Sequence, residues 1–273
     1  MNQGLDEFCP QALENGLRTE KLGRNAVLLA QVDSTNAEAR RRALAGEGDG
    51  TVVIASLQSA GRGRRGRHWV SEEGCGLWLT AVTQPNVSTE ELQQVTLLTA
   101  VAVCRALRAL TDGKLRLTIK WPNDVLTQGR KLCGILCETV TDGAGNRSTL
   151  IGVGINTRSP RMGYGDAEDI AISVQRACGR EVPRLALAAA LLNEMETLLS
   201  EWEMNGFAPV AAAYREFMVP KGTDVVLIDA LNGKRGRIEG VDDGGALLVR
   251  LEDGAQERVI SGEISVRGVG GYV

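Results

Sequence analysis

Residues 51–83 read TVVIASLQSAGRGRRGRHWVSEEGCGLWLTAVT. Apolar residues dominate its two ends, 51–57 and 76–83, which predicts a β-strand at each end. The seven positions from 61 to 67 between them hold four arginines and three glycines. A strand, a basic glycine-rich loop and a second strand therefore form the sharpest local feature of the chain.

The glycines of this loop follow the pattern G-x-G-x-x-G, yet three familiar phosphate-binding motifs do not fit. A dinucleotide-binding fold needs a helix directly after the glycines and an acidic residue about 20 positions later. This loop instead continues to Trp69 and a strand, and position 86 is an asparagine. A protein kinase needs an H-R-D motif, but the single histidine already lies in the loop. A P-loop ends in Gly-Lys-Ser/Thr, whereas Gly66 is followed by Arg67.

The chemistry of the loop still indicates an anionic ligand. Arginine binds carboxylates and phosphates in a bidentate manner, and glycine lets the backbone approach a ligand closely. A solvated basic turn or an arginine-glycine RNA-binding patch is the alternative, and it stays open on the loop alone. The position between two strong strands favours a loop that covers a ligand.

Composition limits the other classes of function. The chain has 31 Lys and Arg residues against 34 Asp and Glu, a net charge of −3, which excludes a general nucleic-acid or membrane-surface binder. Its six cysteines are scattered, and with one histidine they offer no zinc set. A catalytic Ser-His-Asp or Cys-His set is equally unsupported. Reduced thiols and the lack of a secretory signal predict a cytoplasmic protein. Glycine is abundant, at 33 of 273 residues.

The pattern of apolar residues along the rest of the chain predicts an α+β protein. Further strands are expected at 26–32, 115–120, 131–141 and 148–154, and helices at 5–17, 37–45, 88–110, 184–205 and 209–218. Capping boxes, Thr35 with Glu38 and Ser88 with Glu91, mark two helix starts. After residue 219, four or five short strands separated by Gly-rich turns predict a small β-barrel. We expect a body at 1–219, a barrel at 220–273, and no N-terminal winged helix for DNA.

Two further segments are candidates for ligand contact. Lys120-Trp121-Pro122-Asn123-Asp124 places a lysine at a strand end before a turn that Pro122 makes rigid. Gly152-Val153-Gly154-Ile155-Asn156 puts glycine inside a strand, where a ligand or another backbone often approaches. An ordinary turn and tight packing under a helix are the respective alternatives.

Taken together, these motifs resemble those of biotin protein ligases. The resemblance covers about residues 26–267, in the order 33–36, 58–67, 120–124, 131–138 and 152–156, and it extends to the segment 262–267 of an SH3-like domain. It implies a mixed β-sheet catalytic domain flanked by helices, of the class II synthetase/biotin-lipoate ligase type, followed by a small C-terminal SH3-like β-barrel. In the expected lack of a winged helix, the sequence resembles the monofunctional members of the family.

The resemblance also implies an activity and a set of site residues. The family uses ATP with Mg²⁺ to make biotinyl-5′-AMP and passes biotin to a lysine of a biotin carboxyl carrier domain. By motif match, the catalytic residues are Lys120 and Arg62. The implied biotin-binding residues are Ser34, Thr35, Asn36, Gln58, Gly61, Arg62, Arg64, Lys120, Gly134, Gly152 and Gly154. The implied ATP- or adenylate-binding residues are Arg64, Arg65, Arg67, Trp69, Lys120, Asn123 and Asn156. Metal ligands are not assigned.

Alternatives remain. A lipoate or octanoate ligase shares the catalytic fold, and a non-catalytic adenylate- or RNA-binding module would use the arginine loop alone. The expected partners are biotin, ATP and a carrier domain, without DNA or membrane. The sequence leaves a homodimer open.

Overall fold

The computed structural model describes residues 8–88, 90–229, 233–260, 264–268 and 272. Along the chain, the elements are α1 (Pro10–Glu14), β1 (Asn25–Val32), α2 (Thr35–Leu44), β2 (Thr51–Gln58), η1 (Arg64–Gly66), β3 (Gly76–Thr83), η2 (Glu91–Gln93), α3 (Gln94–Leu110), β4 (Leu117–Lys120), β5 (Asp124–Thr127), β6 (Arg130–Thr141), β7 (Arg147–Asn156), η3 (Gly165–Ala167), α4 (Val174–Cys178), α5 (Arg184–Asn205), α6 (Ala208–Phe217), β8 (Asp224–Asp229), β9 (Lys234–Val241), β10 (Leu247–Leu251), β11 (Gln256–Val259) and β12 (Ile264–Gly268).

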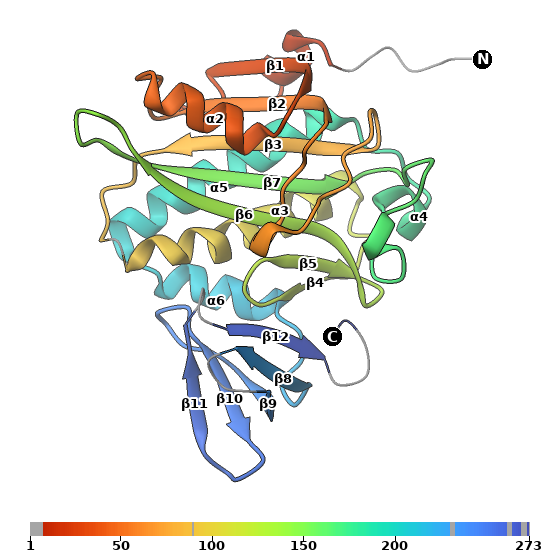
Figure 1. Cartoon of the computed structure of the whole chain (residues 1–273), viewed down its shortest axis with the longest axis vertical. Coiled ribbons are helices and arrows are strands. Elements are labelled where there is room, and N and C mark those ends of the chain that lie inside the picture. The colour runs from red at the N-terminus through yellow and green to blue at the C-terminus, as the bar shows by residue number, and fades with distance from the viewer. Residues whose placement is uncertain (1–7, 89, 230–232, 261–263, 269–271, 273) are drawn as a thin grey trace.

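A seven-stranded mixed sheet forms the body of the protein (Figure 1). Its order is β1-β2-β3-β7-β6-β5-β4, and β1 pairs with β2 in parallel while the other neighbours are antiparallel. The connection between β2 and β3 crosses in front of β7 and β6 (Figure 1). This connection contains the arginine loop, so the loop lies over the centre of the sheet.

Alternation along the strands assigns one helix layer to each face of the sheet. Val53 of β2 packs with Ala39 and Ala43 of α2, whereas its neighbours Val52 and Ile54 belong to the larger core. That core contains α3 and α5, which cover the opposite face. Because side chains alternate between faces in a strand, a single apolar strand serves both layers.

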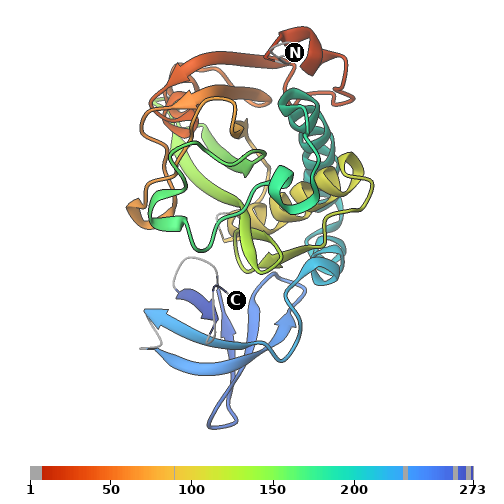
Figure 2. The same ribbon diagram turned by 90° about the vertical axis from the view of Figure 1, so that its right-hand side faces the viewer.

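The C-terminal strands form a separate antiparallel sheet below the body (Figure 2). Its order is β11-β10-β9-β8-β12. The turn 242–246 attaches this sheet to the body, since the indole Nε1 of Trp121 donates to the carbonyl of Gly245 at 3.1 Å and Gln94 Nε2 donates to that of Gly244 at 2.9 Å. Within the described residues, β11 and β12 are not paired with each other, so the expected barrel is seen as a sheet. The division at 219/220 stays a prediction.

Most expected elements are confirmed, with a few corrections. The first helix is short, Pro10–Glu14, and residues 5–7 of the expected one lie outside the described residues. The capping box at Thr35 is wrong, because Ser34 is the N-cap and the Thr35 hydroxyl donates to Gln58. The box at Ser88 and Glu91 is present, with reciprocal bonds of 3.0 and 3.3 Å. The residues 262 and 263 of the SH3-like motif lie outside the described part.

Among the described helices, none is long and apolar enough to span a bilayer.

Candidate functional site

A pocket opens on the face of the sheet that carries α2, beneath the arginine loop. It encloses about 440 Å³ including open space at its mouth, within the usual range for small-ligand sites. The lining residues come from the start of α2, the end of β2 with the arginine loop, the β4–β5 turn, and strands β6 and β7. They are Ser34, Thr35, Asn36, Gln58, Arg62, Gly63, Arg64, Trp69, Asn123, Lys131, Gly134, Ile135, Leu136, Gly152, Val153 and Gly154.

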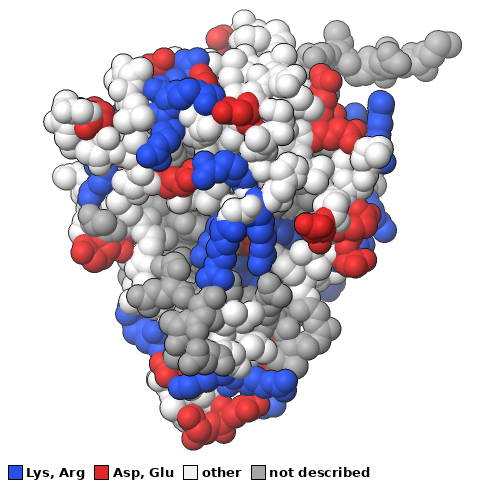
Figure 3. All heavy atoms as spheres, in the orientation of Figure 1, with Lys and Arg blue, Asp and Glu red and all other residues white. Residues whose placement is uncertain are grey.

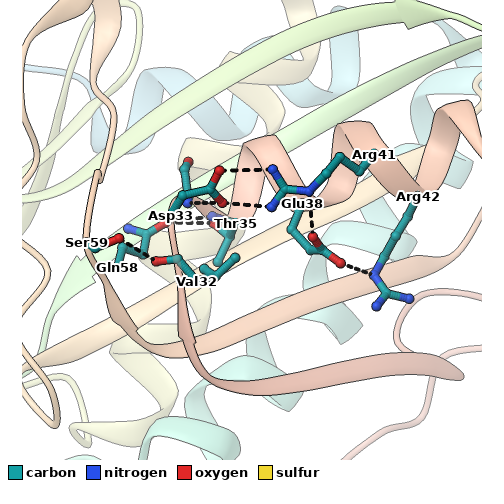
Figure 4. Close-up of polar contacts among 9 residues, drawn as sticks. Val32, Asp33, Thr35, Glu38, Arg41, Arg42, Gln58 and Ser59 are labelled. Atoms are coloured by element: carbon teal, nitrogen blue, oxygen red, sulfur yellow. Dashed lines mark hydrogen bonds and ion pairs between the residues drawn. The ribbon is translucent and has the colours of Figure 1, made fainter.

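Neutral polar groups form one wall of the pocket. The side-chain oxygen of Gln58 accepts from the backbone N–H of Thr35 at 2.8 Å and from its hydroxyl at 3.1 Å (Figure 4). The amide nitrogen of Gln58 donates to Ser71 Oγ at 2.7 Å. Ser34 and Thr35 are buried, so this wall is held by fixed hydrogen bonds with no charged group in it. Such a wall suits a neutral polar ligand group such as an amide or urea.

Asn36 joins the polar wall to the arginine loop. Its amide nitrogen donates to Glu138 Oε2 at 2.9 Å, and its oxygen lies 2.7 Å from the Thr80 hydroxyl. Glu138 in turn pairs with Arg62 at 3.4 Å. A Cβ atom at Gly152 would lie 2.0 Å from the Asn36 oxygen. Glycine at 152 therefore makes the room that the Asn36 side chain needs.

The indole of Trp69 covers the bare part of the sheet. Gly134 and Gly154 pair across β6 and β7, and a Cβ at either would come within 2.9 Å of the Trp69 ring. Lys131 Nζ lies 5.1 Å from that ring's centroid. The buried Nε1 of Trp69 has no hydrogen-bond partner among the described residues. An unpaired buried donor beside a pocket is available to a ligand acceptor.

Cationic groups surround the open side of the pocket. Arg64 Nη1 donates to Asn123 Oδ1 at 2.9 Å, and burial lowers the pKa of the Arg64 guanidinium from its usual value, although an arginine stays protonated in proteins. Arg62, Arg65 and Arg67 are exposed. Figure 3 shows basic side chains gathered in the middle of this face. Of the four arginines that the sequence predicted for this site, Arg62 and Arg64 line the pocket.

Lys120 lies on the β4–β5 hairpin, outside the lining of the pocket. It is 7% exposed, and register places it opposite Asp124. Its Nζ donates to the main-chain carbonyl of Tyr272 at 2.6 Å. Asp124 forms an ion pair with Lys131 at 2.6 Å, which ties the hairpin to β6.

The structure therefore brings most, but not all, of the predicted residues into one site. Four others join Lys120 outside the lining: Gly61, Arg65, Arg67 and Asn156. Gly61 is buried against the carbonyl of Trp69. The Asn156 amide donates to the carbonyl of Ile172 at 3.2 Å, which supports the neighbouring loop.

Sequence reasoning assigned no role to several residues of the site. These are Lys131, Ile135, Leu136 and Val153, which line the pocket, and Thr80 beneath Asn36. Lys131 stood within a recognised motif, so its position three residues before Gly134, which pairs with Gly154, carried a usable signal. Thr80 carried none, because an isolated threonine in a strand is ordinary.

The arrangement of the described side chains favours one kind of ligand. No group of three His, Cys, Asp or Glu side chains able to hold a metal exists within the described ranges. A neutral polar wall, an aromatic cover and cations at the mouth match a ligand with a polar head and an anionic end.

Comparison with known proteins identifies relatives that bind a ligand of this kind. The model of the "Biotin/lipoate A/B protein ligase family" matches residues 28–156, and that of the "Biotin protein ligase C terminal domain" matches residues 225–267. A bifunctional ligase/repressor BirA of Bacillus spizizenii is 33% identical over 92% of this chain and 77% of its own. A biotin–[acetyl-CoA-carboxylase] ligase of Paracoccus denitrificans is 34% identical over 84% of this chain and 95% of its own.

Solved structures agree with these relatives. A biotin protein ligase from Aquifex aeolicus in complex with biotin and ATP has a TM-score of 0.79 and 28% identity, over 90% of this chain and 99% of that one. A Leishmania major ligase in complex with biotinyl-5-AMP has a TM-score of 0.60 and 27% identity, over 87% and 99%. From its paired domains, its pocket and these relatives, the chain belongs to the biotin protein ligase family.

Proposed function

We propose that this protein activates biotin with ATP to biotinyl-5′-AMP, releasing pyrophosphate, and transfers the biotinyl group to a lysine of a biotin carboxyl carrier domain. The observation that carries the proposal is the pocket itself, with neutral hydrogen-bonding groups on one wall and arginines at the mouth. Biotin has the matching distribution of polar and charged groups, because its ureido ring is neutral and polar and its valeryl chain ends in a carboxylate.

In this proposal the polar wall receives the ureido ring. Ser34, Thr35 and Gln58 supply hydroxyl and amide groups there, and burying a urea without such partners costs about 1–3 kcal/mol. Gly152 has no side chain, which leaves room for Asn36 in this wall. Gly134 and Gly154 pair with each other and likewise leave space beneath the Trp69 ring. The ligand chain then runs under the arginine loop, with Gly61 at the base of the loop.

The first chemical step joins two anions. A carboxylate oxygen of biotin attacks the α-phosphorus of ATP, the bond from that phosphorus to the bridging oxygen breaks, and pyrophosphate leaves. Positive groups must offset the repulsion and stabilise the charge that develops on the phosphoryl oxygens. Lys120 and Arg62 are the proposed catalytic groups, with Arg64 beside them. Arg65, Arg67, Asn123 and Asn156 are proposed for the nucleotide side, with Trp69 adjoining it.

The second step is aminolysis of a mixed anhydride. The carrier lysine's neutral amine attacks the acyl carbon, a C–N bond forms, the bond to the phosphate oxygen breaks, and AMP leaves while the amine loses a proton. AMP is a good leaving group, so the enzyme needs no covalent nucleophile. This agrees with a pocket lining that contains no cysteine or histidine.

Magnesium does not fit as a protein-built site. The only carboxylate of the β4–β5 turn, Asp124, is engaged by Lys131 at 2.6 Å, and no cluster of three metal-binding side chains occurs in the part of the chain described. We propose that Mg²⁺ enters as part of the ATP complex, since this ion is commonly held by substrate phosphates and few protein ligands.

We also propose a carrier domain, and not DNA, as the macromolecular partner. The net charge of −3 supports this choice. All six cysteines are free thiols, which supports a cytoplasmic location.

A pyrophosphate-release assay tests the proposed function. The assay contains ATP, Mg²⁺ and one acid at a time: biotin, lipoate or octanoate. We expect release only with biotin, followed by a biotin-sized mass increase on one lysine of an added carrier domain. Release with lipoate or octanoate alone would replace the biotin assignment by that of the lipoate-ligase relatives. Binding of RNA without release would indicate a non-catalytic module.

A further inference from the structure

Tyr272, next to the last residue of the chain, contacts the hairpin that carries Lys120. Lys120 Nζ donates to the main-chain carbonyl of Tyr272 at 2.6 Å and lies 3.6 Å from the centroid of its ring. The Tyr272 hydroxyl donates to the carboxylate of Asp124. One residue from the C-terminal end therefore contacts both ends of the β4–β5 turn.

These contacts lie in a dry environment. Lys120 and Asp124 are each 7% exposed, and contacts of a desolvated ammonium with an aromatic face are stronger than exposed ones. The hairpin is held from the C-terminal sheet at a second point, where Trp121 Nε1 donates to the carbonyl of Gly245 at 3.1 Å. Two separate segments of the C-terminal part thus fix the same five-residue stretch.

The nature of the Tyr272 contacts is informative. A carbonyl oxygen and the face of a phenol ring attract an ammonium without carrying a formal charge. Lysine has a long flexible stem, so holding its ammonium in place is a separate requirement from supplying its charge.

We propose that Tyr272 is a positioning residue for adenylate formation, holding the Lys120 ammonium through its ring and carbonyl and the Asp124 carboxylate through its hydroxyl. The inference rests on the proposed catalytic role of Lys120.

Two substitutions separate the groups of Tyr272. Tyr272→Phe keeps the ring and the carbonyl, whereas Tyr272→Ala removes the ring. For biotin-dependent pyrophosphate release we expect Tyr272→Ala to lower kcat about 5- to 30-fold, the range of a cation–π contact. The KM for biotin should stay within about two-fold, because the pocket is not altered. Tyr272→Phe should retain most of kcat, a rescue that general damage to the fold would not produce.

Matched controls exclude an effect on folding. Ile260→Ala changes another residue of the C-terminal part, 37% exposed, and should leave kcat and the thermal midpoint unchanged. Tyr272→Ala should have the same thermal midpoint as Ile260→Ala.

Binding of a non-reactive biotinyl-adenylate analogue then tests whether Tyr272 acts through Lys120. Tyr272→Ala should weaken this binding in the native background and have less than about two-fold effect in a Lys120→Ala background.

The outcomes distinguish this inference from the proposed function. A Tyr272→Ala protein with native kcat, beside an inactive Lys120→Ala protein, overturns the positioning role alone. A Tyr272→Ala protein with increased kcat or a lower KM for ATP also overturns it, because the residue would then obstruct the site. A Lys120→Ala protein that still makes adenylate overturns the role of Lys120 itself, and with it the role of Tyr272.

Discussion

At the residue scale, a charged network fixes the start of α2 beside the pocket. Arg41 binds both oxygens of Asp33 at 2.8 and 2.9 Å and also pairs with Glu38 (Figure 4). Asp33 Oδ1 accepts the backbone N–H of Ser34 at 2.8 Å. The residue before the pocket wall is therefore anchored to the helix that follows it.

This network changes the acidity of Asp33, which gives a measurable prediction. The hydrogen bonds from Arg41 lower the Asp33 pKa from 3.8 to about 2. We expect a carbon-13 NMR titration of the carboxyl to show this value, and Arg41→Ala to return the pKa toward 3.8. Because the folded-state pKa is the lower one, the pair stabilises the fold above about pH 4 and loses its effect as the pH falls toward 2.

The free energy involved should be below about 1 kcal/mol, since both side chains are about half exposed. Arg40→Ala is the control, because Arg40 forms no ion pair with Asp33 in the described structure. An Asp33 pKa that stays near 2 in Arg41→Ala would contradict the assignment of its cause.

Single residues were the least predictable part of the site. Arg62, Arg64 and Gln58 were predicted because their motifs are local, and the structure places them in the pocket lining. Tyr272 could not be predicted, since it meets Lys120 only through the path of the C-terminal sheet. No periodicity in the sequence links positions so far apart.

At the element scale, β7 and α2 meet at one point where the strand contributes no side chain. Gly152 faces α2, and the Asn36 amide fills the space that a Cβ would occupy. The strand thereby fixes the orientation of a pocket residue that belongs to a helix. Backbone of β6 contributes too, because the carbonyl of Leu136 accepts from the Asn36 amide at 3.2 Å.

Gly152→Ala tests this contact. The new methyl group would displace the Asn36 side chain and break its bonds to Glu138 and Thr80, so we expect biotin affinity to fall at least about ten-fold. Isothermal titration calorimetry measures the change. Gly143→Ala, in the β6–β7 hairpin where a Cβ meets no atom within 4 Å, should bind biotin normally. Native affinity in Gly152→Ala would remove Asn36 from the binding wall.

Elements were predicted well where periodicity was strong and poorly where it was short. The limits of β3 and α5 agree with those expected from the sequence. Strand β5 was missed because four residues after a proline-containing turn carry too little pattern. Helix α4, with five residues, was missed for the same reason.

At the scale of the whole molecule, two sheets meet at the turn 242–246. Gly245 has a φ of +89°, and its carbonyl accepts the indole N–H of Trp121. Leu97 of α3 and Phe207 surround it, 2.7 and 3.0 Å from where a Cβ would be. The turn is therefore packed tightly into the body as well as bent.

Substitutions at Gly245 and Gly254 separate the free-energy cost of a left-handed backbone from the cost of overpacking. Gly254 has a similar φ of +86° but no atom within 4 Å of a Cβ. Gly254→Ala should cost about 1–2 kcal/mol for the left-handed backbone alone. Gly245→Ala should cost a further amount of about 1–3 kcal/mol for overpacking. Urea unfolding gives both values, and equal losses would show that the interface accommodates a methyl group.

The overall organisation could be predicted from the order of motifs, whereas the way the two sheets join could not. The change in character after residue 219 indicated a second β-rich part, but the role of Gly245 depends on the side chains of a distant helix and of Trp121.

The composition of the pocket has a consequence for how the protein folds. Its walls are drawn from the helix start at Ser34–Asn36, the arginine loop, β6 and β7, so it exists only after strands distant in the sequence have paired. Assembly through such remote contacts is intrinsically slow, and a chain still lacking β7 cannot hold biotin in this way. Bound biotin then stabilises the native state, raising its free energy of unfolding by about 2.7 kcal/mol at a biotin concentration of one hundred times the Kd. Vitamin supply and the standing amount of folded ligase become linked without any control of transcription.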